Sequence, residues 1–380
     1  MTMQRPRPAM AHAWFFPAAA LYATLLLPLS VAGLLGVLPM PPGLAQPLGH
    51  AHELLFGYAL AVVAGYLLGP QPQPRCLALL GCWLAARLLF LAYPGSLLAG
   101  LAAALFAAGL AWQVLPRFLG AAKKWRNQSV APMVGLLALL SSLPATGTGL
   151  LDSSAQARSA LLLLAGLLFF MGGRIIAPAL AGHAQQQGWT LQHRVQPRLE
   201  GAGLLGLAAA LLLGLQPLSQ PLAGLALLLT SLLVLLRWLR WQPWRYRQRA
   251  DLLILLLGYA WLVIGLALYG LHLLWPLPGG NAALHALSIG ALGTLSLAVM
   301  ARTRLLLCWR NANARPWIHA IALLPSLAAL ARLLAGLPGL PPALCLALAA
   351  GLWSLAFAGL LVLLWQLRDS QRADPRQSSR

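Results

Sequence analysis

Two histidines and a glutamate stand together at the start of a long apolar segment. The stretch Gly49-His50-Ala51-His52-Glu53 continues without a break into the apolar run Leu54 to Leu68. Ionisable groups beside lipid are costly unless they serve a purpose, and neutral imidazole is a common ligand of copper and of haem iron. Glu53 can orient one ring or act as a ligand itself. The stretch therefore indicates a metal or haem site.

A simpler interpretation of this stretch stays open. Histidines at a membrane surface often bond only to water or headgroups, and a glutamate at a helix start satisfies free backbone amides. Residues two apart on a helix point to nearly opposite sides. His50 and His52 can therefore serve one site only if the helix begins between them.

Two arginines are candidates for holding an anionic group beside such a site. Arg87 falls inside an apolar segment and needs a buried partner, for which Glu53 or a haem propionate would serve. The alternative is that its side chain reaches the membrane surface. Arg174, in Gly172-Gly173-Arg174-Ile175-Ile176, is a second candidate for a haem propionate, or else a charge that anchors the end of a helix.

The elements that carry these residues are membrane helices. The 380 residues include only 8% charged residues and have a mean hydropathy of +0.77, which excludes a soluble protein with one conventional core. We predict an all-α, polytopic integral membrane protein with one domain over residues 1–380. About 20 apolar residues cross a bilayer, which predicts twelve spans, at residues 14–38, 53–69, 76–93, 96–115, 131–150, 158–178, 201–216, 221–237, 251–272, 282–301, 316–336 and 341–366.

One boundary between predicted spans is ambiguous. The stretch Leu211 to Gln220 contains Gly214 and Pro217, so it fits either a tight turn between two helices or one kinked, re-entrant element. At the other end of the chain, the first apolar stretch is longer than the core of a secretory signal. We therefore expect this stretch to be the first membrane span and not a signal peptide that is cleaved off.

The formal net charge of +20 follows this topology. With a cytoplasmic N-terminus, every lysine and arginine except Arg87, Arg158 and Arg332 falls in an inner segment, as the positive-inside rule expects. Both termini are therefore predicted to be cytoplasmic. Because the basic residues are spread over many short loops, they form no single patch for nucleic acid. The bilayer is the expected partner, and no nucleic acid is.

The same topology sorts the eight histidines. His50, His52, His272 and His285 fall at the outer ends of spans, where neighbouring helices can bring imidazoles together. His285 opens a span in which Gly290 and Gly293 permit close helix approach. His272 ends a span and is also explained as an interfacial residue. The four cysteines show no CxxC or CxxCH spacing, so covalent haem attachment is not indicated.

The order of these motifs resembles the NnrS family of bacterial membrane proteins. The resemblance covers most of the chain. It rests on Trp14-Phe15-Phe16-Pro17, His50 to Tyr58, Gly65 to Leu68, Trp83 with Arg87, Lys124 to Asn127, Gly172 to Ile176, Gly258 to Trp261, His285 to Met300 with Arg302, and Leu352 to Phe357.

The resemblance implies a twelve-span protein of the bacterial inner membrane that is associated with haem and copper. It also implies a role in nitric oxide metabolism or resistance, usually in denitrifying or nitrosatively stressed bacteria. Nitric oxide or a metal-nitrosyl species would then be the ligand, and His50, His52 and His285 are the histidines that match the family pattern.

The chain departs from that pattern in three places. An Asn-Trp-Thr-Gly turn after the second span is replaced by Gly69 to Pro74. A histidine before the Gly-Tyr-Ala-Trp element is replaced by Leu256, and a Gly-His-Thr-Gly-Arg ending reads Leu306 to Arg310, with Leu307 in place of the histidine. If either missing histidine binds metal in the family, this chain has fewer ligands.

Two other classes of protein remain. Twelve spans with few buried charges also suit a transporter of a small ligand or metal chelate, with Glu53 and Arg87 as binding or gating charges. A relative of the haem-copper oxidases is less consistent with the sequence, because those enzymes need several histidines deep in their spans. Here the only HxH pair, His50 and His52, lies at a helix entrance.

Overall fold

The computed structural model describes residues 9–46, 48–120, 125–143, 151–275 and 281–370. Within these ranges the chain is a bundle of helices, as predicted, and its one pairing of strands joins β1 (Ala9–Met10) to β2 (Pro70–Gln71). The longer helices are α1 (His12–Leu34), α5 (Gln73–Ala92), α6 (Leu97–Gly120), α8 (Val130–Ser142), α9 (Ser153–Met171), α10 (Ala177–Gln186), α11 (Pro197–Leu213), α12 (Gln220–Arg240), α13 (Ala250–Leu274), α15 (Thr294–Trp309), α16 (Trp317–Leu334) and α17 (Pro342–Ser370).

Short helical pieces interrupt or precede several of these. The α-helical ones are α2 (Pro42–Ala45), α3 (Gly49–His52), α4 (Leu60–Leu67), α7 (Trp125–Gln128) and α14 (Asn281–His285). Three are π-helical turns, η1 (Glu53–Ala59), η2 (Gly172–Ile176) and η5 (Ala286–Gly293), and two are 3-10 turns, η3 (Pro217–Ser219) and η4 (Pro243–Tyr246). Each π-helical turn continues directly into an α-helix: η1 into α4, η2 into α10 and η5 into α15.

Among the described residues, nine helical segments are long and apolar enough to cross a membrane. The other three predicted spans are helical but shorter or interrupted. Residues 53–69 contain η1 and α4, the described part of the span 131–150 contains α8, and the span 201–216 contains α11. Twelve crossings therefore remain a prediction. Residues 144–150 of the fifth span lie outside the described residues.

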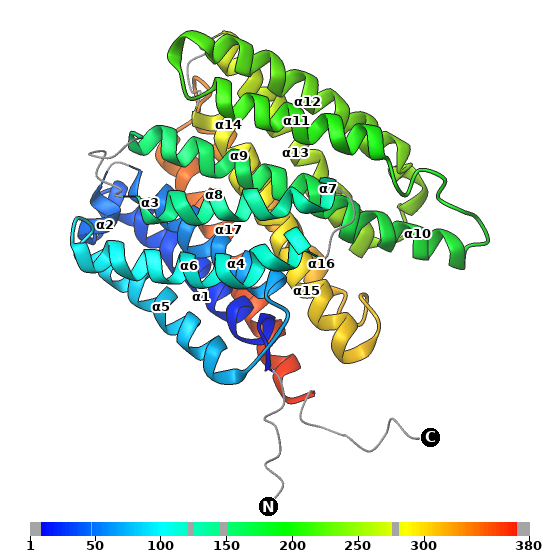
Figure 1. Ribbon diagram of the computed structural model, residues 1–380, viewed down its shortest axis with the longest axis horizontal. Coiled ribbons are helices and arrows are strands. Elements are labelled where there is room, and N and C mark those ends of the chain that lie inside the picture. Colours follow the sequence, from blue (N-terminus) through cyan, green and yellow to red (C-terminus); the bar gives the residue numbers. More distant parts are fainter. Residues whose placement is uncertain (1–8, 47, 121–124, 144–150, 276–280, 371–380) are drawn as a thin grey trace, which may run out of the picture.

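The ambiguous stretch between α11 and α12 is a turn. α11 ends at Leu213, η3 follows, and α12 starts at Gln220 and packs along α11 as a helical hairpin (Figure 1). Pro217 and Gly214 occupy this turn, where a missing N–H and a missing side chain cost least. The interpretation as a tight turn is confirmed over the re-entrant one.

Three helical segments form the centre of the bundle. The protein buries 67% of the most apolar window of Ser153–Gln186, 72% of that of Ala282–Trp309 and 61% of that of Ala250–Leu274, against 39% or less for the other candidate spans. The peripheral helices expose rows of leucine, as expected for surfaces that face lipid. Two of the three central segments contain a π-helical turn.

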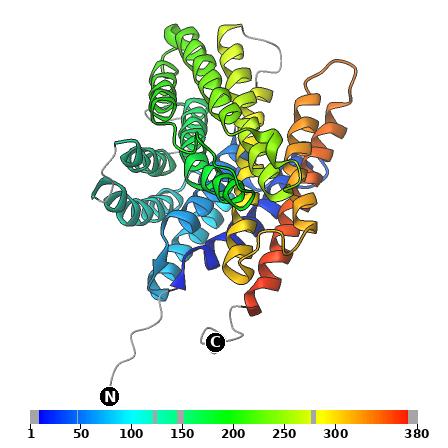
Figure 2. The same ribbon diagram turned by 90° about the vertical axis from the view of Figure 1, so that its right-hand side faces the viewer.

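The first helix begins and the last helix ends at the same end of the bundle (Figures 1 and 2). α1 and α17 also pack against each other. This arrangement agrees with an even number of crossings. That this end faces the cytoplasm remains a prediction from the distribution of charge.

Candidate functional site

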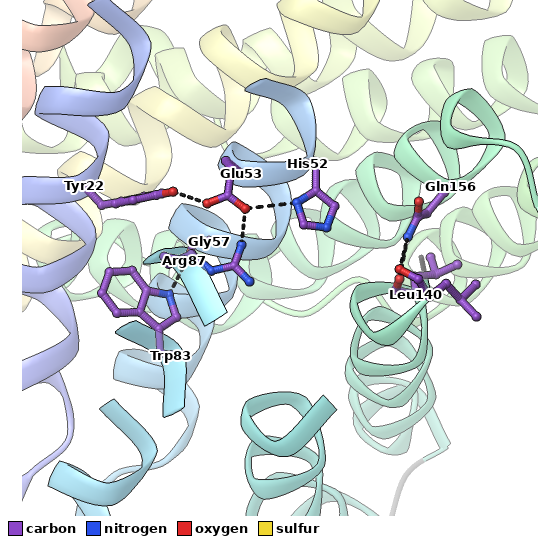
Figure 3. A network of polar contacts seen from close by, with 9 residues as sticks. Tyr22, His52, Glu53, Gly57, Trp83, Arg87, Leu140 and Gln156 are labelled. Atoms are coloured by element: carbon purple, nitrogen blue, oxygen red, sulfur yellow. Dashed lines mark hydrogen bonds and ion pairs between the residues drawn. The ribbon is translucent and has the colours of Figure 1, made fainter. Parts of the chain in front are cut away.

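The Glu53 carboxylate is the centre of a buried polar site. Its side chain has no solvent exposure, and one of its oxygens, Oε1, lies 2.5 Å from Arg87 Nη1 and 3.0 Å from His52 Nδ1. The Tyr22 hydroxyl donates a hydrogen bond to the other oxygen, Oε2. Figure 3 shows these side chains converging on Glu53. The glutamate thus bonds to side chains and does not cap a helix start, which rejects the simpler interpretation of its role.

Local structure explains how these side chains meet. Glu53 and Gly57 both belong to η1, and a side chain at Gly57 would place its Cβ 2.8 Å from Tyr22 Cε1 and 2.9 Å from Arg87 Cδ. Such distances are shorter than real Cβ contacts, so the glycine leaves the space that Arg87 and Tyr22 occupy. The Trp83 indole donates to the Gly57 carbonyl at 2.9 Å (Figure 3). Because Trp83 and Arg87 are four residues apart on α5, one helix face supplies both contacts.

Arg87 is buried, at 1% exposure, and its side chain does not reach the membrane surface. Its guanidinium balances the Glu53 charge at short range. A buried pair of this kind is stable only when both charges are compensated and hydrogen-bonded. Of the two partners expected for Arg87, the structure therefore supplies Glu53.

His52 is oriented by the carboxylate. A carboxylate that is paired with a guanidinium accepts hydrogen bonds, so we assign the Nδ1–H of His52 as the donor to Glu53. The Nε2 atom is then the one that keeps a lone pair. The ring is 8% exposed and stacks on Phe90, with centroids 4.0 Å apart and planes at 14°. A histidine whose second nitrogen is held by a carboxylate is the usual arrangement of a metal-binding imidazole.

His50 does not share this environment. The helix α3 begins at Gly49, before both histidines, so the condition for a shared site is not met. Among the described residues, the side chains that bond to Glu53 are those of Tyr22, His52 and Arg87, and His50 is not one of them. The two imidazoles consequently point to different sides of one helical turn.

The remaining predicted histidines lie on other elements. His285 is the last residue of α14 and is partly exposed, and His272 lies near the end of α13 with Nδ1 buried and without a hydrogen-bond partner among the described residues. In the part of the chain that the structure describes, no three His, Cys, Asp or Glu side chains form a group that could hold a metal ion. Among the described residues, His52 is the imidazole whose Nδ1 is held by a carboxylate.

Arg174 lies apart from Glu53. It belongs to η2 and lines a polar cavity together with Arg237 and Glu200. Glu200 lies in the first turn of α11 and forms an ion pair with Arg237 at 2.9 Å. The candidates Glu53, Arg87 and Arg174 therefore belong to two sites.

A small apolar cavity of about 90 Å³ lies among the helices that follow the Glu53 site. It is lined by α4 with the last residue of η1, by α9 with η2, and by η5 with α15; Phe16 of α1 completes the lining. Almost all of its surface is apolar. π-Helical turns are rare and are frequent at functional sites, and here three of them meet around one cavity.

Two residues of the Glu53 site were not identified from sequence. Tyr22 is a tyrosine in an apolar span, and nothing in its spacing signals a carboxylate partner 31 positions along the chain. Gly57 could have been identified from the sequence. It lies one helical turn after Glu53, where a missing side chain leaves space for the buried partner that Arg87 needs. The pairing of Trp83 with Arg87 on one face was visible in the sequence.

Comparison with known proteins gives one family. The family model described as NnrS protein matches residues 8–369, which is nearly the whole chain. A search of curated proteins finds no match.

Proposed function

Because the chain belongs to the NnrS family, we propose that it is an NnrS-like protein of the bacterial inner membrane that binds haem and protects against nitric oxide. The observation that carries this proposal is the His52–Glu53 pair, a buried imidazole whose Nδ1 is held by a carboxylate 3.0 Å away. Haem, when bound, would supply an iron atom with affinity for nitric oxide or for a metal-nitrosyl species.

Each residue of the site has a role in this proposal. His52 would bind the iron through Nε2, while Glu53 fixes the tautomer and the orientation of the ring and strengthens it as a ligand. Arg87 and Tyr22 bond to the two oxygens of Glu53 and keep its side chain in place, since a carboxylate without such partners is costly to bury. Phe90 keeps the imidazole plane in place by stacking on it.

The apolar cavity supports the choice of nitric oxide as ligand. A dry cavity lined by apolar side chains favours small apolar molecules over water. Nitric oxide is such a molecule and enters lipid readily. We propose that nitric oxide reaches the site through this cavity, whose lining includes Ala59, the last residue of the π-helical segment that starts with Glu53.

The test is an absorption spectrum with metal analysis on the protein purified in detergent. The parent should show a haem band that shifts on addition of nitric oxide, and His52→Ala should lose it. His50→Ala is the matched control, because it removes an imidazole from the same helical turn but not from Glu53, and it should retain haem. His285→Ala tests the remaining histidine that matches the family.

Glu53→Gln separates positioning from ligation. The Glu53→Gln variant should keep some haem, but the reduction potential of that haem should change, because His52 no longer has a carboxylate that polarises it. A colourless parent without copper or iron would overturn the proposal and favour transport. In that case uptake of a small ligand or metal chelate into vesicles should depend on Glu53 and Arg87.

A further inference from the structure

The polar cavity that Arg174 lines lies between η2, α11 and the end of α12, and it has a volume of about 230 Å³. Three arginines line it, Arg174, Arg194 and Arg237, together with a single acidic residue, Glu200. A water molecule takes up about 30 Å³ in the liquid, so the cavity has room for a group of several heavy atoms. Its lining carries more positive than negative charge.

Arg237 is the fixed part of this cavity. Its side chain is 1% exposed, and it donates to the Phe169 carbonyl at 2.8 Å and to the Tyr259 hydroxyl at 3.1 Å. The guanidinium lies over the rings of Phe169 and Trp241. Its Nε is buried without a hydrogen-bond partner among the described residues. A buried donor without a partner costs free energy that a bound acceptor would recover.

The other two arginines are exposed and face the same space. Arg174 contacts the ring of Phe170, with its guanidinium carbon 5.1 Å from the centroid, and neither Arg174 nor Arg194 has an ion-pair partner within the described ranges. Side chains of this kind are free to turn toward an incoming anion. Their planar, forked donors match the oxygens of phosphate well.

A glycine keeps the cavity open. A Cβ at Gly173 would lie 2.3 Å from Arg237 Nη2 and 3.5 Å from Glu200 Oε1. Any larger residue at this position of η2 would displace the Arg237–Glu200 ion pair. The π-helical turn therefore presents Arg174 next to a position that has no side chain.

We propose that this cavity binds a phosphate group. Three guanidiniums against one carboxylate leave an excess of two positive charges, which matches a phosphate monoester of about −1.5 to −2 better than a carboxylate of −1. The source is either the headgroup of an anionic phospholipid or a soluble phosphate. The cavity lies at the end of the bundle that the charge pattern predicts to be cytoplasmic, where both are present.

The experiment uses the full chain in nanodiscs of phosphatidylcholine. One arm titrates inorganic phosphate by calorimetry, and the other adds phosphatidic acid to the nanodiscs and measures its retention by native mass spectrometry. Arg174→Gln and Arg194→Gln are compared with the parent. Arg247→Gln is the matched control, since it removes the same charge from an exposed arginine outside the cavity.

Each cavity variant should weaken binding by about tenfold or more, because a hydrogen bond to a charged group contributes that much, and Arg247→Gln should not. Weakening in the calorimetric arm assigns a soluble phosphate, and weakening in the retention arm assigns a lipid. No binding in either arm, or equal loss in Arg247→Gln, would overturn the proposal. All variants must elute as single species. The result is independent of haem content, so it stands or fails separately from the proposed function.

Discussion

Arg87 Nη1 lies 2.5 Å from Glu53 Oε1, and the two side chains are 2% and 0% exposed. The pair joins α5 to η1 inside a bundle that has few other charges. Desolvating two charges costs several kcal/mol per ion, which their attraction offsets only when the geometry is good and the remaining polar atoms are bonded. Tyr22, His52 and Arg87 provide those bonds to both oxygens of Glu53.

Glu53→Gln should destabilise the protein strongly. The substitution leaves the Arg87 guanidinium buried without a counter-charge, which costs about 3–5 kcal/mol. Thermal unfolding in detergent, followed by circular dichroism, should show a lower midpoint temperature. Glu53→Gln with Arg87→Met should recover part of the loss, because the second change removes the uncompensated charge. The single variant Arg87→Met completes the comparison. If the fall in midpoint temperature of the double variant equals the sum of the falls in Glu53→Gln and Arg87→Met, the pair is not coupled as the structure indicates.

Gly57→Ala should destabilise the same site by overpacking. Its Cβ would lie 2.8 Å from Tyr22 Cε1 and 2.9 Å from Arg87 Cδ, so the ion pair has to move. Inserting a methyl group into a filled space costs about 1–3 kcal/mol. Gly81→Ala is the control on the neighbouring helix, because a Cβ there meets nothing within 4 Å. It should be neutral or slightly stabilising, and equal losses in both variants would contradict the prediction.

The sequence predicted the class of fold and part of this site for physical reasons. Apolar runs of membrane length identify helices directly, and Glu53 and Arg87 were identified because an ionisable residue in such a run needs a partner. Their pairing is now observed, with Glu53 as the partner of Arg87. The role of His52 as a ligand stays a prediction.

Other features depended on packing that no local pattern reveals. The π-helical turns carry no distinctive composition, so η1 was expected to be an ordinary helix start. The partnership of Tyr22 with Glu53 joins positions 31 residues apart through the docking of α1 on η1. Arg174 was grouped with Glu53 by residue type alone, and the structure places it on η2, in the polar cavity that Arg237 and Glu200 also line.

Asp152 should make the stability of α9 depend on acidic pH. It is the N-cap of α9, and the Ala155 amide and the Ser154 hydroxyl donate to its carboxylate, which lowers its pKa below the usual value. The folded pKa lies below the unfolded one. The contribution of the Asp152 carboxylate to the stability of the folded protein is therefore complete above the unfolded pKa of about 3.9, and it is lost as the pH falls through the folded pKa.

Asp152→Asn is the matched variant for this prediction, because asparagine caps a helix equally well but does not titrate. The difference in midpoint temperature between parent and variant should be constant from neutral pH down to about pH 5 and should change below about pH 4. Asp152→Ala should cost about 0.5–1 kcal/mol at neutral pH by loss of the cap. A constant difference between parent and Asp152→Asn down to pH 2 would refute the linkage.

Gly224 of α12 and Gly270 of α13 let two helices touch through their backbones. A Cβ on Gly224 would lie 2.7 Å from the Gly270 carbonyl oxygen, and a Cβ on Gly270 would lie 2.8 Å from the Gly224 carbonyl oxygen. Small residues serve this purpose in membrane helices, where close packing drives association. Either alanine must push the same two backbones apart, at a cost of about 1–3 kcal/mol.

Because the collision is shared, the two substitutions should not add. Once Gly270→Ala has separated the helices, Gly224→Ala meets a wider gap and should cost much less than it does alone. Gly351→Ala in α17 is the control, since a Cβ there meets nothing within 4 Å and the change should gain helix propensity. Thermal unfolding of the three single variants and the Gly224→Ala/Gly270→Ala pair measures this directly. Full additivity would mean that each glycine serves a separate contact, against the reciprocal geometry of α12 and α13.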